Sequence, residues 1–140
     1  MNTQFQAADF IVNKPEKPVA RLLLAHGAGA SMQSEYLQQL AILLAAQSIE
    51  VWRFNFAYMA KTVAGQKQPP AKVATLLQEM AALITQLPND LPLFIGGKSM
   101  GGRVSTLLAA DAALLSATVK GVVVFGYPFC PPAKKQLGIE

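Results

Sequence analysis

The stretch "LPLFIGGKSMGGR" at residues 91–103 joins an apolar run to glycines that flank a serine on both sides. The apolar run is typical of a buried strand, and Val104, Leu107 and Leu108 follow it at helical spacing. A G-x-S-x-G sequence between a strand and a helix indicates a nucleophile elbow, in which a strained turn exposes the serine hydroxyl. Ser99 is therefore the candidate nucleophile. It would lie at a helix N-terminus, where free N–H groups favour developing negative charge.

The letters "GKS" within the same stretch also suggest a phosphate-binding loop. Such a loop requires G-x-x-x-x-G-K-[ST], because the residues before the lysine wrap around the phosphates. Pro92 stands where the first glycine should be, and residues 92–96 belong to the expected strand. A phosphate or nucleotide binder is therefore kept only as a third hypothesis.

Strands and helices alternate along the rest of the chain with short connections, which predicts an α/β fold. The expected parallel sheet has at least four strands and is covered by helices on both faces. The expected strands are "VARLLLAHG" (19–27), "IEVWRFNF" (49–56), "LPLFIGG" (91–97) and "GVVVFG" (121–126). Helices are expected over 35–47, over 73–87 and from the elbow as far as Leu115, whereas 57–70 is expected to be a loop.

The first expected helix carries an apolar stripe that should face the sheet. Ser31 or Ser34 is expected to cap this helix. The stripe consists of Tyr36, Leu37, Leu40, Leu43 and Leu44.

Composition limits the class of protein. With 140 residues the chain has the size of one domain, expected to span 1–140, and its 52% of hydrophobic residues excludes disorder. The net charge of +4 is spread along the chain, so no nucleic-acid partner is expected. A single cysteine, Cys130, excludes an internal disulfide and is interpreted as an ordinary thiol. No signal peptide or membrane span is visible, which predicts a soluble, cytoplasmic protein without a membrane partner.

A second glycine-rich turn, "AHGAGAS" at residues 25–31, follows the first long strand. A dinucleotide-binding fingerprint is excluded, because Met32 occupies its third small position and no acid ends the next strand. The alternative is an oxyanion loop, whose backbone N–H groups point at the site beside the serine. The expected donors are the N–H groups of Met100 and Ala28. The glycines expected to line this part of the site are Gly27 and Gly29.

His26 is the single histidine of the chain, and two roles are open to it. It could be a general base, or it could hydrogen-bond the backbone and shape the oxyanion loop. The second role is favoured, because the base of such a site normally follows the nucleophile in the chain.

Other polar residues are expected to line the same cleft. Lys98 and Arg103 flank the elbow and could bind an anionic substrate group or belong to the solvated surface. Arg53, Asn55 and Tyr58 follow the second long strand, at the sheet end where parallel sheets bind ligands. Their roles stay unassigned. No metal or cofactor is expected.

Five motifs in this order resemble one family of α/β-hydrolases. They are "LLLAHGAGA", "RFNFAYM", the double proline at 69 and 70, "GGKSMGGR" and "GYPF.PP". The family includes testis-expressed protein thirty and subunit three of the NSL histone-acetylation complex, and its bacterial members resemble dienelactone hydrolases in outline. The resemblance implies Ser99 as nucleophile and Met100 and Ala28 at oxyanion positions, and it implies nothing as firm about the substrate. The first functional hypothesis is a serine hydrolase of an ester-like or other acyl small-molecule substrate.

Two departures from the family pattern limit this interpretation. Cys130 stands where the family usually has histidine, and the chain reaches only Glu140, before the triad aspartate and histidine of the family. Asp111, expected on a helix, and Glu140 are the only acids after Ser99. The resemblance therefore implies the amino-terminal two-thirds of the fold, with acid and base in further sequence.

An incomplete sheet would also expose an apolar strand edge near Val122 to Phe125. Such an edge could bind a protein partner or a second copy of the chain. A non-catalytic scaffold or protein-interaction module is therefore the second functional hypothesis.

Overall fold

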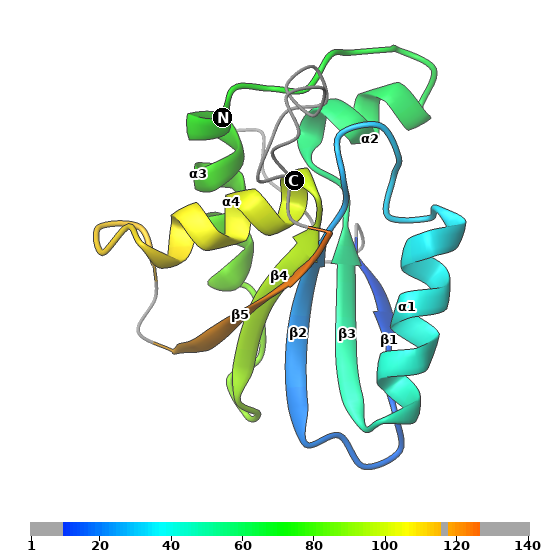
Figure 1. Cartoon of the computed structure of the whole chain (residues 1–140), viewed down its shortest axis with the longest axis vertical. Helices are drawn as coiled ribbons and strands as arrows, with labels where there is room; N and C mark the ends of the chain where they lie inside the picture. The colour runs from blue at the N-terminus through cyan, green and yellow to red at the C-terminus, as the bar shows by residue number, and fades with distance from the viewer. Residues whose placement is uncertain (1–9, 116–117, 127–140) are drawn as a thin grey trace, which may run out of the picture.

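The computed structural model describes residues 10–115 and 118–126 and confirms the α/β fold (Figure 1). The strands form one sheet in the order β1-β3-β2-β4-β5, in which β2 to β5 are parallel and β1 is antiparallel to β3. The strands are β1 (Ile11–Asn13), β2 (Ala20–Ala25), β3 (Ile49–Phe54), β4 (Leu93–Lys98) and β5 (Val119–Phe125). The helices are α1 (Glu35–Ala46), α2 (Ala57–Val63), α3 (Val73–Ile84) and α4 (Met100–Ala109).

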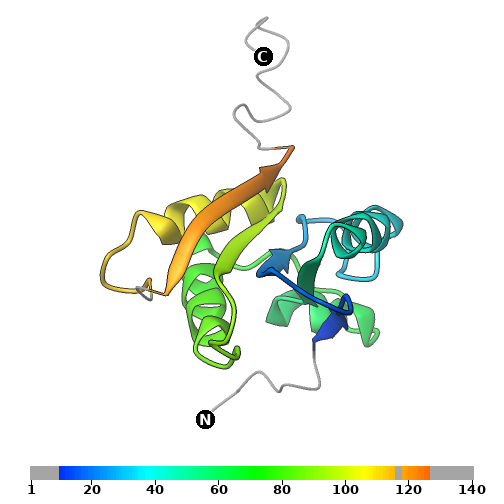
Figure 2. The same cartoon turned by 90° about the horizontal axis from the view of Figure 1, so that it is seen from below.

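Alternate side chains of the central strand β2 enter two different cores. Leu23 and Ala25 belong to the larger core, which α3 and α4 help to form, whereas Leu22 and Leu24 pack with α1 on the other face. Figure 2 shows α1 and α3 on opposite sides of the twisted sheet. All six residues of β2 are buried, as expected for a strand covered on both faces. None of the helices in the described part of the chain is long and apolar enough to cross a bilayer.

The predicted apolar stripe of α1 is only partly correct. Ser34 caps the helix by accepting a hydrogen bond from the N–H of Leu37. Leu37 and Ala41 form the buried line, whereas Tyr36 is 47% and Leu43 is 63% exposed. The helix contacts β3 and β1 at one side of the sheet, so its buried face is narrower than its apolar face.

Two short elements were not predicted, and one helix ends early. Residues 57–63, expected to be loop, form α2, whose Tyr58 and Met59 are buried. The proline-rich start of the chain contributes β1, which pairs with β3. α4 ends at Ala109 and does not reach Leu115. Tertiary contacts explain the first two differences, since isolated elements of this length are not stable.

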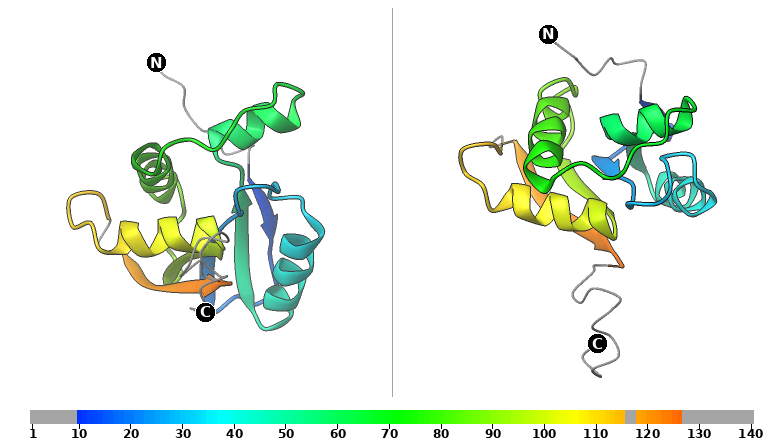
Figure 3. Two further views of the ribbon diagram at one scale, coloured as in Figure 1. Left: turned by 45° about the horizontal axis from the view of Figure 1, so that its top comes forward. Right: turned by 90° about the horizontal axis from the view of Figure 1, so that it is seen from above.

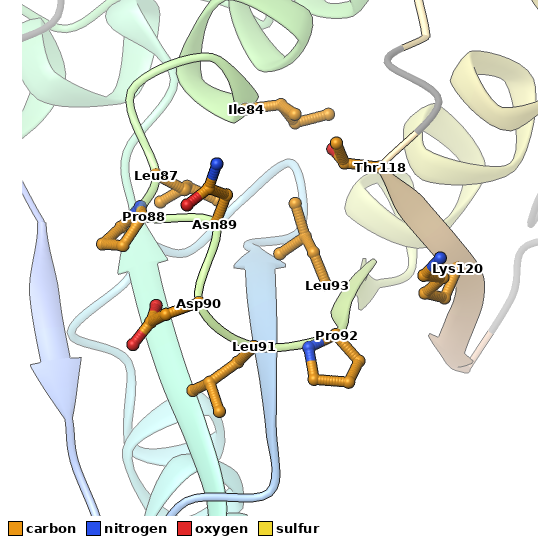
Figure 4. Close-up of a pocket in the computed structure, with 10 residues that line it drawn as sticks. All are labelled: Ile84, Leu87, Pro88, Asn89, Asp90, Leu91, Pro92, Leu93, Thr118 and Lys120. Carbon is orange, nitrogen blue, oxygen red and sulfur yellow. The ribbon is translucent and has the colours of Figure 1, made fainter.

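The amino ends of the central strands are joined by a buried ion pair. Arg21 donates from Nε to the Glu50 carboxylate at 2.5 Å, and also reaches Asp90 at 3.0 Å. Beside Asp90 lies a cavity of about 370 Å³ between the loop that precedes β4 and the start of β5 (Figure 4). This cavity is at the end of the sheet opposite to Ser99, whereas parallel sheets bind ligands at the carboxyl ends of their strands.

Candidate active site

Ser99 lies between β4 and α4 in a backbone conformation that L-residues rarely adopt. Its φ is +53° and its ψ is −114°, close to the mirror image of the extended region. Such a conformation costs on the order of 1–3 kcal/mol and persists only where the surrounding structure enforces it. The Ser99 N–H donates to the carbonyl of Phe125 at 3.0 Å, and its carbonyl accepts from the N–H of Arg103 at 3.0 Å. The strained serine is thus held from both sides.

The glycines at the elbow allow α4 to approach β2 at backbone distance. A Cβ on Gly101 would lie 2.6 Å from the carbonyl oxygen of Ala25, and one on Gly97 would lie 2.6 Å from that same oxygen. Atoms other than hydrogen cannot approach so closely without a hydrogen bond, so a side chain at either position would push the helix away from the sheet. The G-x-S-x-G spacing therefore has a direct steric cause.

The glycine-rich loop after β2 reaches the elbow at Gly27. A Cβ on Gly27 would lie 3.7 Å from the Cβ of Ser99. The carbonyl of Gly27 accepts a hydrogen bond of 2.5 Å from Nδ1 of His26. Because the peptide unit is planar and trans, this bond also fixes the direction of the Ala28 N–H on the opposite side of that unit. The two expected oxyanion residues, Ala28 and Met100, accordingly lie on segments that meet at Ser99.

His26 has both ring nitrogens in hydrogen bonds to the backbone. Nε2 accepts from the N–H of Phe56 at 3.1 Å, so the proton is on Nδ1, which donates to Gly27. The side chain is fully buried, and burial lowers the pKa of His26 below its usual value, although the bond to Gly27 opposes this. These contacts are those of the structural role rather than of a general base.

Tyr58 connects α2 to the glycine-rich loop. Its hydroxyl donates to the carbonyl of Ala28 at 2.9 Å and lies 3.9 Å from the sulfur of Met100. Burial raises the pKa of Tyr58, which keeps the hydroxyl protonated as a donor. One side chain therefore touches both expected oxyanion residues.

Arg53 and Asn55 hold the far end of the same loop. Arg53 donates to the carbonyl of Met32 at 2.8 Å, and Asn55 accepts from the N–H of Met32 at 2.8 Å. Arg53 also binds the side chain of Asn13 on β1 at 3.1 Å. Both residues are buried, and Arg53 lies within β3 rather than after it. They act on the site indirectly, because they fix the position of the glycine-rich loop.

The remaining expected site residues lie around this centre without joining it. The ammonium group of Lys98 lies 5.1 Å from the ring centroid of Tyr36, toward α1. Arg103 is exposed on α4, and Gly29 is exposed in the glycine-rich loop. Asp111 lies just beyond α4, where it accepts from the N–H of Ala113. It is separated from Ser99 by the length of α4, about 15 Å.

Glu79 on α3 is a residue of the site that sequence reasoning missed. Its carboxylate accepts from the N–H of Ala57 at 3.0 Å and so caps α2, which has no side-chain cap of its own. Burial raises the pKa of Glu79, while the bond to Ala57 lowers it. No local sequence pattern predicts this cap, because Glu79 and Ala57 are 22 residues apart. Cys130 and Glu140 lie outside the described residues.

Residues 18–138 match a family model described as "Alpha/beta hydrolase domain". No curated protein matches the sequence significantly.

Solved structures share the fold at low sequence identity. A dienelactone hydrolase from Anabaena variabilis has a TM-score of 0.69 and 20% identity over 84% of this chain and 56% of its own. A carboxyl esterase from Bacillus coagulans has a TM-score of 0.65 and 18% identity, over 87% of this chain and 42% of its own. A thioesterase domain from the curacin biosynthetic pathway has a TM-score of 0.57 and 22% identity, over 92% of this chain and 46% of its own. The chain thus spans about half the length of these proteins.

The strain at Ser99 predicts that glycine stabilises this position relative to alanine. Ser99→Ala keeps the Cβ and the strain, whereas Ser99→Gly removes both. Relief of the strain should stabilise the glycine variant by about 1–3 kcal/mol. The greater conformational entropy that glycine loses on folding offsets about 0.5–1 kcal/mol of this. We expect Ser99→Gly to exceed Ser99→Ala by about 1 kcal/mol in free energy of unfolding, measured in urea. Equal stability of the two variants would contradict the strained geometry.

The lowered pKa of His26 predicts a loss of stability in acid. The unfolded chain takes up a proton near the usual histidine pKa of about 6.5, whereas the folded state resists protonation until lower pH. The free energy of unfolding should therefore decrease as the pH falls below about 6.5, by up to about 1.4 kcal/mol per pH unit.

His26→Asn is the matched variant, because asparagine can still donate to Gly27 but does not titrate. His26→Asn should be less stable at neutral pH. Its free energy of unfolding in urea should also depend less steeply on pH than that of the wild-type protein. The raised pKa of Glu79 makes the free energy of unfolding increase as the pH falls, which is the opposite of the effect of His26. Glu79 has this effect in the wild-type protein and in the variant alike. An identical slope would show that His26 is not the titrating group.

Proposed function

The chain belongs to the alpha/beta hydrolase domain family, and from this premise we propose that it is a serine hydrolase of ester or other acyl substrates. Ser99 would attack the acyl carbon. The N–H groups of Met100 and Ala28 would bind the oxygen that becomes negative in the tetrahedral intermediate. The closer relationship to the testis-expressed protein thirty family is part of this proposal and rests on the five sequence motifs.

The observation that supports the proposal most directly is the strained backbone of Ser99. Ser48, in the turn between α1 and β3, also has a positive φ, of 69°, so the sign of φ alone does not indicate a functional turn. At Ser99 the positive φ is combined with a ψ of −114° and with glycine contacts on both sides, an arrangement expected of a nucleophile elbow. Met100 begins α4, so its N–H has no acceptor within the helix and is free to donate to a ligand. The helix N-terminus adds a favourable potential for an oxyanion.

The general base is proposed to lie outside the described residues. A serine hydroxyl is a weak nucleophile without a base oriented by a third group. His26 does not serve, because its accepting nitrogen is occupied by Phe56 and its ring is fully buried. Without base and acid, only the oxyanion contacts and substrate binding contribute to the rate, a residual acceleration of about 10³–10⁴ in serine proteases.

Covalent labelling tests the role of Ser99. A fluorophosphonate probe should modify Ser99 on prolonged incubation, because without a general base only the oxyanion contacts and probe binding accelerate the attack. Mass spectrometry of the digested protein should place the added mass on the peptide that contains residues 99–103. Ser99→Ala should abolish the label. Ser105→Ala is the matched control and should keep it, because Ser105 is buried and donates to the carbonyl of Gly101. Absence of Ser99-dependent labelling in a folded sample would refute the enzymatic proposal.

A second candidate function, self-association through the sheet edge, is supported by an apolar groove. β5 ends the sheet formed by the described residues, and Val123 and Val124 on it are 39% and 40% exposed. Beside it, on the α1 face, lies a cavity of about 220 Å³ with a wholly apolar lining. The lining residues are Ala20, Leu22, Leu44, Ile49, Phe94, Val123 and Phe125. An edge and a groove of this kind favour pairing with another chain.

Sedimentation should distinguish this candidate. The wild-type protein should show an average mass that rises with concentration, and Val123→Lys should restore the monomer, because lysine on an edge strand opposes pairing. Leu43→Lys is the control, since Leu43 is exposed on α1, away from the edge. A wild-type monomer at all concentrations, or an equal effect of both variants, would argue against the interface at β5.

A further inference from the structure

A cavity of about 630 Å³ lies between the glycine-rich loop and α2, at the carboxyl ends of the strands. In Figure 1 the loop after β2 runs beside α2, and Figure 3 shows the long connection from α2 to α3 crossing the same end of the molecule. The volume falls within the roughly 300–1,000 Å³ of typical small-molecule sites. The loop contributes residues 28–31 to the lining, and the segment that includes α2 contributes Tyr58, Met59, Thr62, Val63 and 67–70.

The walls of this cavity are fixed by hydrogen bonds. The Tyr58 hydroxyl holds the carbonyl of Ala28 at 2.9 Å. The Thr62 hydroxyl donates to the carbonyl of Tyr58 at 3.0 Å and accepts from the N–H of Gln68 at 3.0 Å. These bonds tie the loop, the helix and the connection beyond it to one another. The walls of the cavity are therefore preformed.

The chemistry of the lining indicates what the cavity can bind. Its apolar surface comes from alanines, Met59, Val63 and two prolines. The Thr62 and Tyr58 hydroxyls both already donate to backbone carbonyls. Lys67 is exposed, and no acidic residue contributes to the lining. Ser31 and Gln68 are the other polar residues of the lining. A hydrocarbon chain fits the apolar part of these walls, where a sugar or another group with many hydroxyls would leave hydroxyls without hydrogen bonds.

The cavity adjoins the candidate active site, although neither Ser99 nor Met100 lines it. Ala28 lines it and is also an expected oxyanion donor, and the preceding residue, Gly27, faces the side chain of Ser99. Tyr58, which lines the cavity, reaches the sulfur of Met100 at 3.9 Å. A group attached to a carbonyl carbon at Ser99 would therefore have the cavity within reach.

We propose that this cavity binds an apolar chain of the substrate, so that the preferred substrates are esters or thioesters with a medium-length hydrocarbon arm. The inference rests on the proposed function, because it takes Ser99 as the reacting residue. It adds a class of substrate and a residue that selects it: Val63, whose side chain is 54% exposed at the end of α2, borders the space that the chain would fill.

The first test measures how fast fluorophosphonates with methyl, butyl or octyl chains modify Ser99. The chain is placed on phosphorus in one series and on the alkoxy oxygen in the other, which distinguishes the acyl side from the alcohol side. In one series the octyl probe should react at least about tenfold faster than the methyl probe, because burial of each methylene group is favourable. Val63→Trp should fill the cavity and bring this ratio toward one.

Ile42→Trp is the matched control, since Ile42 is 52% exposed on α1 and does not line the cavity. It should keep the wild-type ratio. A ratio near one in the wild-type protein, or a ratio that Val63→Trp leaves unchanged, would overturn the inference.

A binding test separates this inference from the reactivity of Ser99. Octanoate is titrated into Ser99→Ala while the methyl signals of Met59 and Val63 are followed by NMR. Saturable shifts of these signals, smaller with butyrate, would support the cavity even if no probe labelled Ser99. In the Ser99→Ala, Val63→Trp double variant the Met59 methyl signal should no longer shift. Failure of octanoate to shift them would overturn it, whether or not Ser99 reacts.

Discussion

The close approach of α4 to β2 is the constraint on which the rest of the site depends. Because Gly101 lacks a side chain, the first turn of α4 packs directly against the carbonyls of Ala25 and His26. This contact fixes where the helix begins and forces the chain between β4 and α4 through the unfavourable conformation at Ser99. It also sets the loop after β2 beside the elbow. Strain at one residue is thus offset by packing across two strands and a helix.

A second constraint acts on the glycine-rich loop, which would be mobile if left to its own sequence. The side chains of Arg53, Asn55 and Tyr58 and the backbone N–H of Phe56 hold the turn after β2 at three of its positions: His26, Ala28 and Met32. The segment after one strand therefore orders the segment after its neighbour. Preorganised hydrogen-bond donors stabilise a developing charge better than donors that must first reorganise. The hydrogen bonds that hold the loop would therefore support the proposed oxyanion site.

The sequence predicted those features that depend on local pattern. The four parallel strands, the helices α1, α3 and α4 and the α/β fold follow from apolar periodicity and from the glycines at the elbow. The helix α2 could not be predicted, because Ala57 is capped by Glu79 from another helix and no capping residue precedes it. The links from Arg53 and Asn55 to Met32 were missed for the same reason. The buried face of α1 was misjudged, because periodicity shows which side of a helix is apolar but not how much of it the sheet covers.

The two proposed functions meet at β5. The N–H of Ser99 donates to the carbonyl of Phe125, the last residue of that strand, so the terminal strand of the described sheet directly supports the elbow. The side of β5 that has no partner strand among residues 10–115 and 118–126 lies next to this support. Any strand added there in parallel would bring its own carboxyl end beside that of β5, at the end of the sheet where open parallel sheets assemble their sites. A base that is not among the described residues could therefore reach Ser99 by way of this edge. Within the described residues, the exposed apolar surface of β5 and the proposed route of the base to Ser99 thus lie at the same edge of the sheet.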